Sequence, residues 1–105
     1  MEYITPAVLK KQLDSNAAIV LLDIREQYER DICHIGGIHM PMAEVSSRAN
    51  ELDVNAKIAV LCRSGKRAEA VANFLATEAG FDDVCIVEGG ILAWIVEVDA
   101  SLEAY

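Results

Sequence analysis

The sequence predicts an α/β domain with a mainly parallel central sheet and helices on both faces. Three short, continuous apolar runs, at 19–23, 58–62 and 84–87, are typical of strands buried on both faces of a parallel sheet. Segments with helical periodicity alternate with these runs, which implies right-handed crossovers between parallel strands. With 105 residues and a 53% hydrophobic content, the chain has the size of one domain. We therefore expect a single domain over residues 1–105.

The first half of the chain contains two expected strands and two expected helices. A short strand is expected at 2–4, and a helix should begin after Thr5, a good N-cap residue, with Pro6 at its first position. The apolar run at 19–23 forms the next strand. The segment at 42–52 has the spacing of a short amphipathic helix.

The second half contains the clearest helix, which should follow Cys62. Its apolar residues recur at helical spacing on one face, and Gly80 stands where a left-handed C-terminal cap would fall. These apolar residues are Ala68, Val71, Ala72, Leu75 and Ala79. The strand at 84–87 then leads to a last helix at 91–98, which is followed by a polar tail to Tyr105.

Charge and cysteine content exclude several classes of partner. Nine Lys and Arg face seventeen Asp and Glu, a formal charge of −8 that disfavours nucleic acids and anionic membranes. The apolar runs are far shorter than the ~20 residues of a membrane span, and no export signal precedes the first helix. Three cysteines without paired spacing argue against a disulfide framework and favour a reducing compartment. We expect a cytoplasmic protein with no nucleic-acid or membrane partner.

The segment "CRSGKRA" at 62–68 carries the clearest chemical signal. Cys62 lies where a strand ends and a helix begins, the place where open α/β sheets bind ligands. A thiol ionises more readily at a helix N-terminus and beside Lys or Arg, and both causes coincide here. We expect Cys62 to be a nucleophilic thiolate inside a cradle for a small anion. The residues expected to form the cradle are Arg63, Ser64, Gly65, Lys66 and Arg67.

Three other interpretations of this segment can be weighed. Cys62 could end a buried strand as an inert thiol, with the cations simply solvated. A phosphatase-like loop is disfavoured because Cys62 and Arg67 bracket four residues rather than the five of tyrosine phosphatases. A nucleotide P-loop is disfavoured because Val60 stands where its first glycine is needed and Arg67 replaces its Ser or Thr.

The cysteine segment resembles the active-site loop of rhodanese-type sulfurtransferases, Cys-Arg-x-Gly-x-Arg. Three further segments are similar to family motifs and follow in the same order: "LLDIREQYE", "HIGGIHMP" and "VEGGILAW". Together the similarities extend from about Leu21 to Trp94. Two departures stand out: Cys33 replaces the usual glycine before His34, and "HIGGIHMP" is one residue shorter than the common pattern.

The resemblance implies a rhodanese-like fold and a sulfur transfer in two half-reactions. The Cys62 thiolate would attack the outer sulfur of thiosulfate or another small anionic donor, and the resulting persulfide would pass to a thiophilic acceptor. No metal or organic cofactor is implied. The C-terminal run also resembles rhodanese modules fused to adenylyltransferases that activate sulfur carriers. The alternative is therefore a protein-to-protein sulfur-relay or binding module with little thiosulfate turnover, whose sulfur-carrier or thiol protein partner would have a basic face.

Acidic and basic residues after the second expected strand have two interpretations. Asp23, Arg25 and Glu26 could support substrate positioning, but such residues at a strand end more often form an ion pair or cap backbone amides. The acids Glu26, Glu29 and Asp31 are expected to form a solvated face.

The remaining candidates are expected to have structural roles. His34, a possible supporting residue of the site, and His39 are expected to form loop hydrogen bonds, since together with Cys33 they match no common zinc spacing. Cys33 could resolve the Cys62 persulfide or form a regulatory disulfide, but a bystander thiol is the simpler expectation. Cys85 is expected to be buried strand filler, and Trp94 to anchor the last helix in the core.

Overall fold

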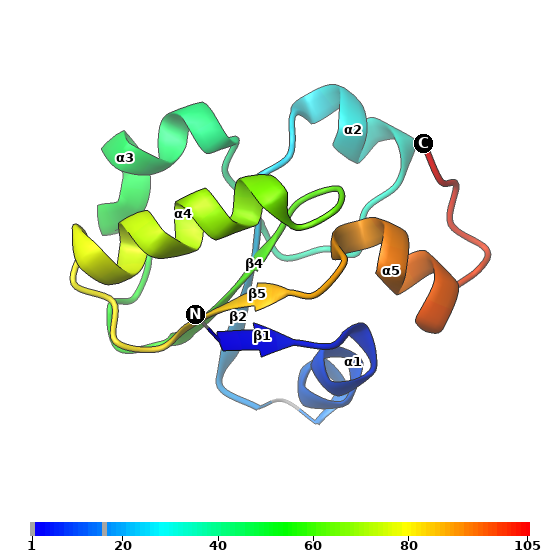
Figure 1. Cartoon of the computed structure of the whole chain (residues 1–105), viewed down its shortest axis with the longest axis horizontal. Helices are drawn as coiled ribbons and strands as arrows, with labels where there is room; N and C mark the ends of the chain where they lie inside the picture. Colours follow the sequence, from blue (N-terminus) through cyan, green and yellow to red (C-terminus); the bar gives the residue numbers. More distant parts are fainter. Residues whose placement is uncertain (1, 16) are drawn as a thin grey trace.

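A parallel sheet forms the centre of the protein, as predicted, and it has five strands. The computed structural model describes residues 2–15 and 17–105. The strand order is β1-β5-β4-β2-β3, which places β4 in the middle (Figure 1). The strands are β1 (Glu2–Ile4), β2 (Ile19–Asp23), β3 (Ile38–His39), β4 (Lys57–Leu61) and β5 (Val84–Val87). All four connections are crossovers between parallel strands, and each contains a helix.

The helices begin and end where local sequence signals allow. In α1, the Thr5 hydroxyl accepts a hydrogen bond from the Val8 amide and Pro6 opens the helix, as expected. The long helix after Cys62 is confirmed, and Gly80 behind it has φ +80°. The helices are α1 (Pro6–Asp14), α2 (Gln27–Ile32), α3 (Val45–Arg48), α4 (Lys66–Thr77) and α5 (Gly90–Glu97), with the 3-10 turns η1 (Met42–Glu44) and η2 (Ala49–Glu51).

Two elements were not predicted, and one prediction was too simple. Helix α2 is only six residues long and is started by a reciprocal capping box between Glu26 and Glu29. Strand β3 has two residues, too few to leave a periodic pattern. The segment 42–52, predicted as one helix, consists of η1, α3 and η2, because its Ser and Asn residues favour turns over a continuous helix.

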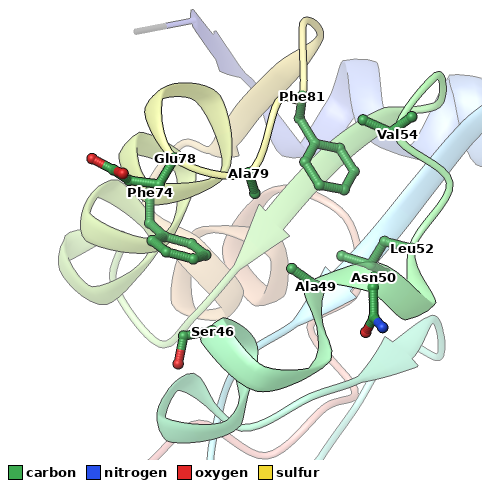
Figure 2. Close-up of a pocket in the computed structure, with 9 residues that line it drawn as sticks. All are labelled: Ser46, Ala49, Asn50, Leu52, Val54, Phe74, Glu78, Ala79 and Phe81. Carbon is green, nitrogen blue, oxygen red and sulfur yellow. The ribbon is translucent and has the colours of Figure 1, made fainter.

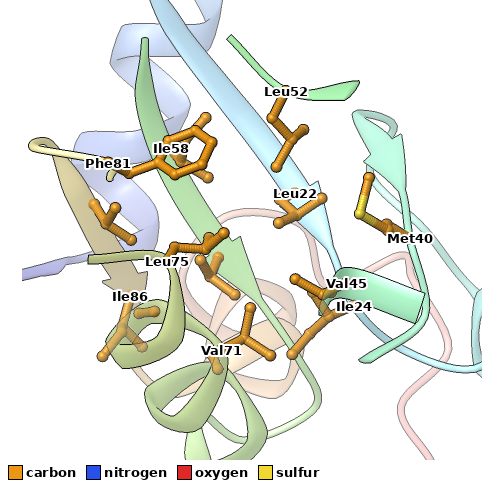
Figure 3. Close-up of a cluster of buried hydrophobic side chains, with 14 of the residues drawn as sticks. Leu22, Ile24, Met40, Val45, Leu52, Ile58, Val71, Leu75, Phe81 and Ile86 are labelled. Atoms are coloured by element: carbon orange, nitrogen blue, oxygen red, sulfur yellow. The ribbon is translucent and has the colours of Figure 1, made fainter. Parts of the chain in front are cut away.

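Two hydrophobic clusters pack against opposite faces of the sheet, because successive strand residues point to opposite sides. Figure 3 shows the first cluster, where α3 and α4 cover one face. It contains Leu22, Ile58, Val60, Ile86, Val71 and Leu75. Helices α1 and α5 cover the other face, where the second cluster contains Leu9, Leu21, Ala59, Leu61, Ile91 and Trp94. Trp94 is 5% exposed, which confirms it as a core anchor.

The sheet brings two segments of the predicted site together. Asp23 and Leu61 are register partners at the ends of β2 and β4. The chain therefore leaves both strands at the same edge of the sheet. Arg25 lies two residues after Asp23, and Cys62 lies one residue after Leu61. Within residues 2–15 and 17–105, no helix is long and apolar enough to cross a membrane.

Candidate active site

The Cys62 thiol lies at the start of α4 and is held by backbone amides. Its Sγ accepts hydrogen bonds from the amide of Gly65 at 3.0 Å and from that of Ala68 at 3.4 Å. Gly65 has φ +112°, a left-handed conformation that glycine adopts without strain and that turns the loop into the helix. Cys62 is only 1% exposed. The sulfur thus faces the positive end of a twelve-residue helix, where negative charge is stabilised.

Helix α5 fixes the cysteine loop from its other side. The amide of Ile91 donates to the Cys62 carbonyl at 2.9 Å, and the amide of Leu92 donates to the Arg63 carbonyl at 3.2 Å. A Cβ atom on Gly90 would lie 2.4 Å from the Arg63 oxygen and 2.6 Å from the Cys62 oxygen. The close approach of the two backbones therefore requires glycine, which explains the second Gly of "VEGGILAW".

The cations of the cysteine loop differ in their partners. Arg67 donates from both terminal nitrogens to the Glu29 carboxylate, at 2.7 and 2.8 Å. Arg63 donates from Nε to the main-chain oxygen of Tyr105 at 2.7 Å, and its Cζ lies 5.2 Å from the centre of the Tyr105 ring. The side chains of Lys66 and Ser64 are exposed. The loop thus presents positive charge. Two of its charged side chains, Arg63 and Arg67, are oriented by residues that are distant in the sequence.

Glu29 is buried at 2% exposure, so the expectation that it belongs to a solvated face is wrong. Its carboxylate accepts four hydrogen bonds: two from Arg67, one from the Tyr105 hydroxyl at 2.7 Å and one from the Glu26 amide at 3.0 Å. The hydrogen bonds from Arg67 lower the pKa of Glu29 to about 2, although burial opposes this shift. Glu26 and Asp31 are exposed, as predicted.

Asp23 and Arg25 form a fully buried ion pair, which confirms the structural interpretation of these residues. The guanidinium donates to the two carboxylate oxygens at 3.0 and 2.9 Å. It also donates to the carbonyl of Cys33 at 2.8 Å, to that of Glu29 at 3.3 Å and to the Tyr105 hydroxyl at 3.0 Å. Each donor group therefore has an acceptor, which a buried guanidinium needs. Any contribution to substrate positioning stays a prediction.

Tyr105 is the site-adjacent residue that sequence reasoning missed. The segment after α5 was expected to be a polar tail, but it returns to α2 (Figure 1), where Tyr105 contacts Arg25 and Glu29. Burial and the bond to the Glu29 carboxylate raise the pKa of the phenol to about 12, although Arg25 acts in the opposite direction. Its partners are 76 and 80 residues away in the sequence, so no local pattern indicates them.

Both histidines form the loop hydrogen bonds expected of them. The Nδ1 of His34 accepts from the Gly36 amide at 3.2 Å, and the Nε2 of His39 lies 2.7 Å from the Arg25 carbonyl oxygen. Within the described ranges 2–15 and 17–105, no group of three or more His, Cys, Asp or Glu side chains could hold a metal ion.

The other two cysteines belong to a different part of the core from Cys62. Cys33 and Cys85 lie in the cluster under α1 and α5, whereas Cys62 lies in the cluster on the opposite face of the sheet. This separation favours the bystander interpretation of Cys33. Burial raises the pKa of the Cys85 thiol to about 11, as suits a buried strand residue.

A separate surface cavity lies away from the cysteine loop (Figure 2). It has a volume of about 460 Å³ and is formed by α3, η2 and the C-terminal part of α4 with the loop behind it. Phe74 and Phe81 contribute its aromatic walls, and Leu52 and Val54 its aliphatic ones. None of its lining residues belongs to the predicted site.

Comparisons with known proteins agree with this fold and with the sequence motifs. A family described as Rhodanese-like domain matches residues 5–97. YrkF of Bacillus subtilis, named as a sulfur carrier protein, is 40% identical over 86 residues, covering 81% of this chain and 46% of that protein. MoeZ of Mycobacterium tuberculosis, named as an adenylyltransferase/sulfurtransferase, is 34% identical over 106 residues, covering 97% of this chain and 26% of that protein. The chain thus spans between a quarter and a half of the length of these relatives.

Among solved structures, a rhodanese-related protein from Thermoplasma volcanium superposes with a TM-score of 0.83 at 32% sequence identity, covering 93% of this chain and 94% of that one. The family match and this superposition lead to one conclusion: the chain belongs to the rhodanese-like domain family.

Proposed function

We propose that the protein is a sulfurtransferase that carries a sulfane sulfur as a persulfide on Cys62. The observation that supports this most directly is the pair of backbone amides, from Gly65 and Ala68, directed at Sγ at the start of α4. Such amides stabilise negative charge on sulfur, both in the thiolate and in a terminal persulfide. The family match and the sulfur-related names of the relatives support sulfur transfer as the general activity.

In the first half-reaction, thiosulfate is the proposed donor. The Cys62 thiolate attacks the outer sulfur, a new S–S bond forms, and the S–S bond of thiosulfate breaks with its electron pair leaving on sulfite. The net charge is unchanged, and Cys62 carries a persulfide anion. The proposed cradle for the donor is the loop of Arg63, Ser64, Gly65, Lys66 and Arg67.

In the second half-reaction, the thiolate of an acceptor attacks the terminal sulfur of the persulfide. The bond between the two sulfurs breaks, its electron pair returns to Cys62, and the acceptor leaves as a persulfide. The exposed Lys66 contributes positive charge at the loop, which would attract an anionic acceptor as well as an anionic donor.

A second candidate function is sulfur relay between proteins, with little turnover of thiosulfate. The names of two relatives favour it, because one is a sulfur carrier and the other joins a sulfurtransferase to an adenylyltransferase. In that case the donor is a persulfidated protein, and the acceptor is a sulfur-carrier or thiol protein. The acidic chain, with a formal charge of −8, would favour a partner with a basic face.

The decisive experiment is intact-protein mass spectrometry after brief incubation with thiosulfate. Wild type should gain one sulfur, about 32 Da, and lose it again with a thiol reductant. Cys62→Ser should gain none, whereas Cys33→Ser, a matched control on the opposite face of the sheet, should behave as wild type. Sulfur on the Cys62→Ser variant would refute the proposal. Sulfur taken only from a persulfidated protein donor would select the relay function.

A further inference from the structure

We propose that Tyr105 is a positioning residue for the sulfur transfer, which orients the two arginines of the cysteine loop, Arg67 through Glu29 and Arg63 by direct contact. This inference rests on the proposed function, because it assigns the residue a role at the same site. Tyr105 lies beyond the last helix and beyond residues 5–97, which the family matches.

The phenol connects two buried charged groups in a fixed order. Its oxygen lies 3.0 Å from Nη1 of Arg25 and 2.7 Å from Oε2 of Glu29. The guanidinium can only donate and the carboxylate can only accept, so the single phenol proton must point to Glu29. A phenol is protonated at neutral pH, and burial raises its pKa further, to about 12. Tyr105 therefore fixes one side of the Glu29 carboxylate.

Glu29 in turn fixes Arg67, with one carboxylate oxygen for each terminal nitrogen of the guanidinium. Oε2 of Glu29, which accepts the hydrogen bond from the phenol, also accepts the one from Nη2 of Arg67. Arg67 lies in the first turn of α4, next to Ala68, whose amide donates to the Cys62 sulfur. A change in the Tyr105 hydroxyl thus reaches the first turn of α4, where the amides that hold the Cys62 sulfur lie, through two intervening side chains.

The ring of Tyr105 acts on the second arginine. The Cζ atom of Arg63 lies 5.2 Å from the ring centre, within the range of a cation–π contact, and its Nε donates to the main-chain oxygen of the same residue. The side chain of Arg63 is exposed, so these contacts reduce the number of conformations that it samples. Of the two loop arginines, the ring therefore contacts Arg63 and the hydroxyl acts on Arg67 through Glu29, while both ring and hydroxyl lie against Arg25.

The experiment compares Tyr105→Phe, which removes only the hydroxyl, with Tyr105→Ala, which removes the ring as well. The matched control is Tyr28→Phe, because Tyr28 lies on α2 beside Glu29 but is 66% exposed. Two rates are measured: persulfide formation as a function of thiosulfate concentration, and alkylation of Cys62 by iodoacetate relative to neutral iodoacetamide. The second ratio reports positive charge at the thiol without requiring any sulfur transfer.

The proposal expects Tyr105→Phe to raise the half-saturating thiosulfate concentration about fivefold and to lower the iodoacetate preference about threefold. Tyr105→Ala should raise the half-saturating concentration and lower the iodoacetate preference further, and Tyr28→Phe should match wild type. In an Arg67→Ala background, Tyr105→Phe should have no additional effect, because the hydroxyl acts through Arg67.

Three results would overturn the proposal. The first is that Tyr105→Phe and Tyr105→Ala both stay within twofold of wild type in both assays, and the second is that Tyr105→Phe keeps its full effect in the Arg67→Ala background. The third is that the Tyr105 variants have a lowered melting temperature but unchanged rates. A failure of the proposed function has a different outcome. Wild type would then gain no sulfur from thiosulfate or from a persulfidated donor, and the alkylation ratio would still decide the role of Tyr105.

Discussion

Replacing Glu29 by glutamine should remove a large part of the stability of this domain at neutral pH. The pKa of Glu29 falls from 4.5 to about 2 in the folded protein, a difference of ~2.5 units. At ~1.36 kcal/mol per unit, ionised Glu29 contributes about 3 kcal/mol to folding. Removing one partner of a buried ion pair typically costs ~3–5 kcal/mol. The lower end applies here, because the Arg67 side chain is 34% exposed and water can solvate it.

The sign of the pH dependence follows from the direction of the shift. A carboxyl group with a lowered folded pKa stabilises the protein fully above its unfolded pKa, and this contribution is lost as pH falls from about 4.5 to about 2. Wild type should therefore exceed Glu29→Gln in unfolding free energy by about 3 kcal/mol at pH 7 and by about 1.4 kcal/mol at pH 3.

Urea unfolding of both proteins at pH 7 and pH 3 measures this difference directly. The control is Glu51→Gln, which removes a carboxylate that pairs with Arg48 on the surface and should change stability little at either pH. An equal gap between wild type and Glu29→Gln at both pH values would refute the reasoning, as would a Glu29→Gln protein as stable as wild type.

Three further predictions follow from the geometry of the site. Gly90→Ala should destabilise the domain by about 3 kcal/mol or more, because the new Cβ would meet the backbone of the cysteine loop. Gly36→Ala, also at positive φ but in open space, should cost only ~1 kcal/mol. Thermal unfolding of the two variants compares these costs. Arg67→Lys should slow persulfide formation about tenfold, since an ammonium cannot bind both Glu29 oxygens in the same way; stopped-flow kinetics would contradict this by showing an unchanged rate. Cys85, with a thiol pKa of about 11, should stay unlabelled by a disulfide reagent at pH 8 in the native protein, and rapid labelling would be inconsistent with its burial.

The parts of the fold that depend on local sequence could be predicted. The runs at 19–23 and 84–87 coincide with β2 and β5, and β4 begins and ends one residue earlier than the run at 58–62. These strands are buried on both faces, so each leaves a continuous apolar run. Helix α2 was missed because it has only six residues and because its N-terminus is marked by a capping box of two glutamates, Glu26 and Glu29. The periodicity of 42–52 suggested a continuous helix that turn-forming residues interrupt.

In the candidate site, too, the residues marked by local sequence could be predicted, and those placed by tertiary contacts could not. Cys62 and the loop after it could be identified, because a thiol, a flexible turn and a helix start lie within seven residues. The burial of Glu29 could not, because its charged partner Arg67 is 38 residues away. The role of Tyr105 could not be predicted either, since only the folded chain brings it to Arg25. Charge alone indicated an exposed Glu29, and the tertiary ion pair overrode that expectation.

The contacts between α5 and the cysteine loop determine when the thiol site can form during synthesis on the ribosome. Cys62 leaves the exit tunnel before Ile91 and Leu92, whose amides bind the carbonyls of Cys62 and Arg63. Strand β5, which separates β1 from β4 in the sheet, also emerges after the loop. Until residues 84–92 are available, the loop lacks its support and β1 lacks its neighbour. A nascent chain therefore carries Cys62 before the contacts that fix its loop can form, and the proposed sulfur chemistry at Cys62 would begin only once the C-terminal elements have folded.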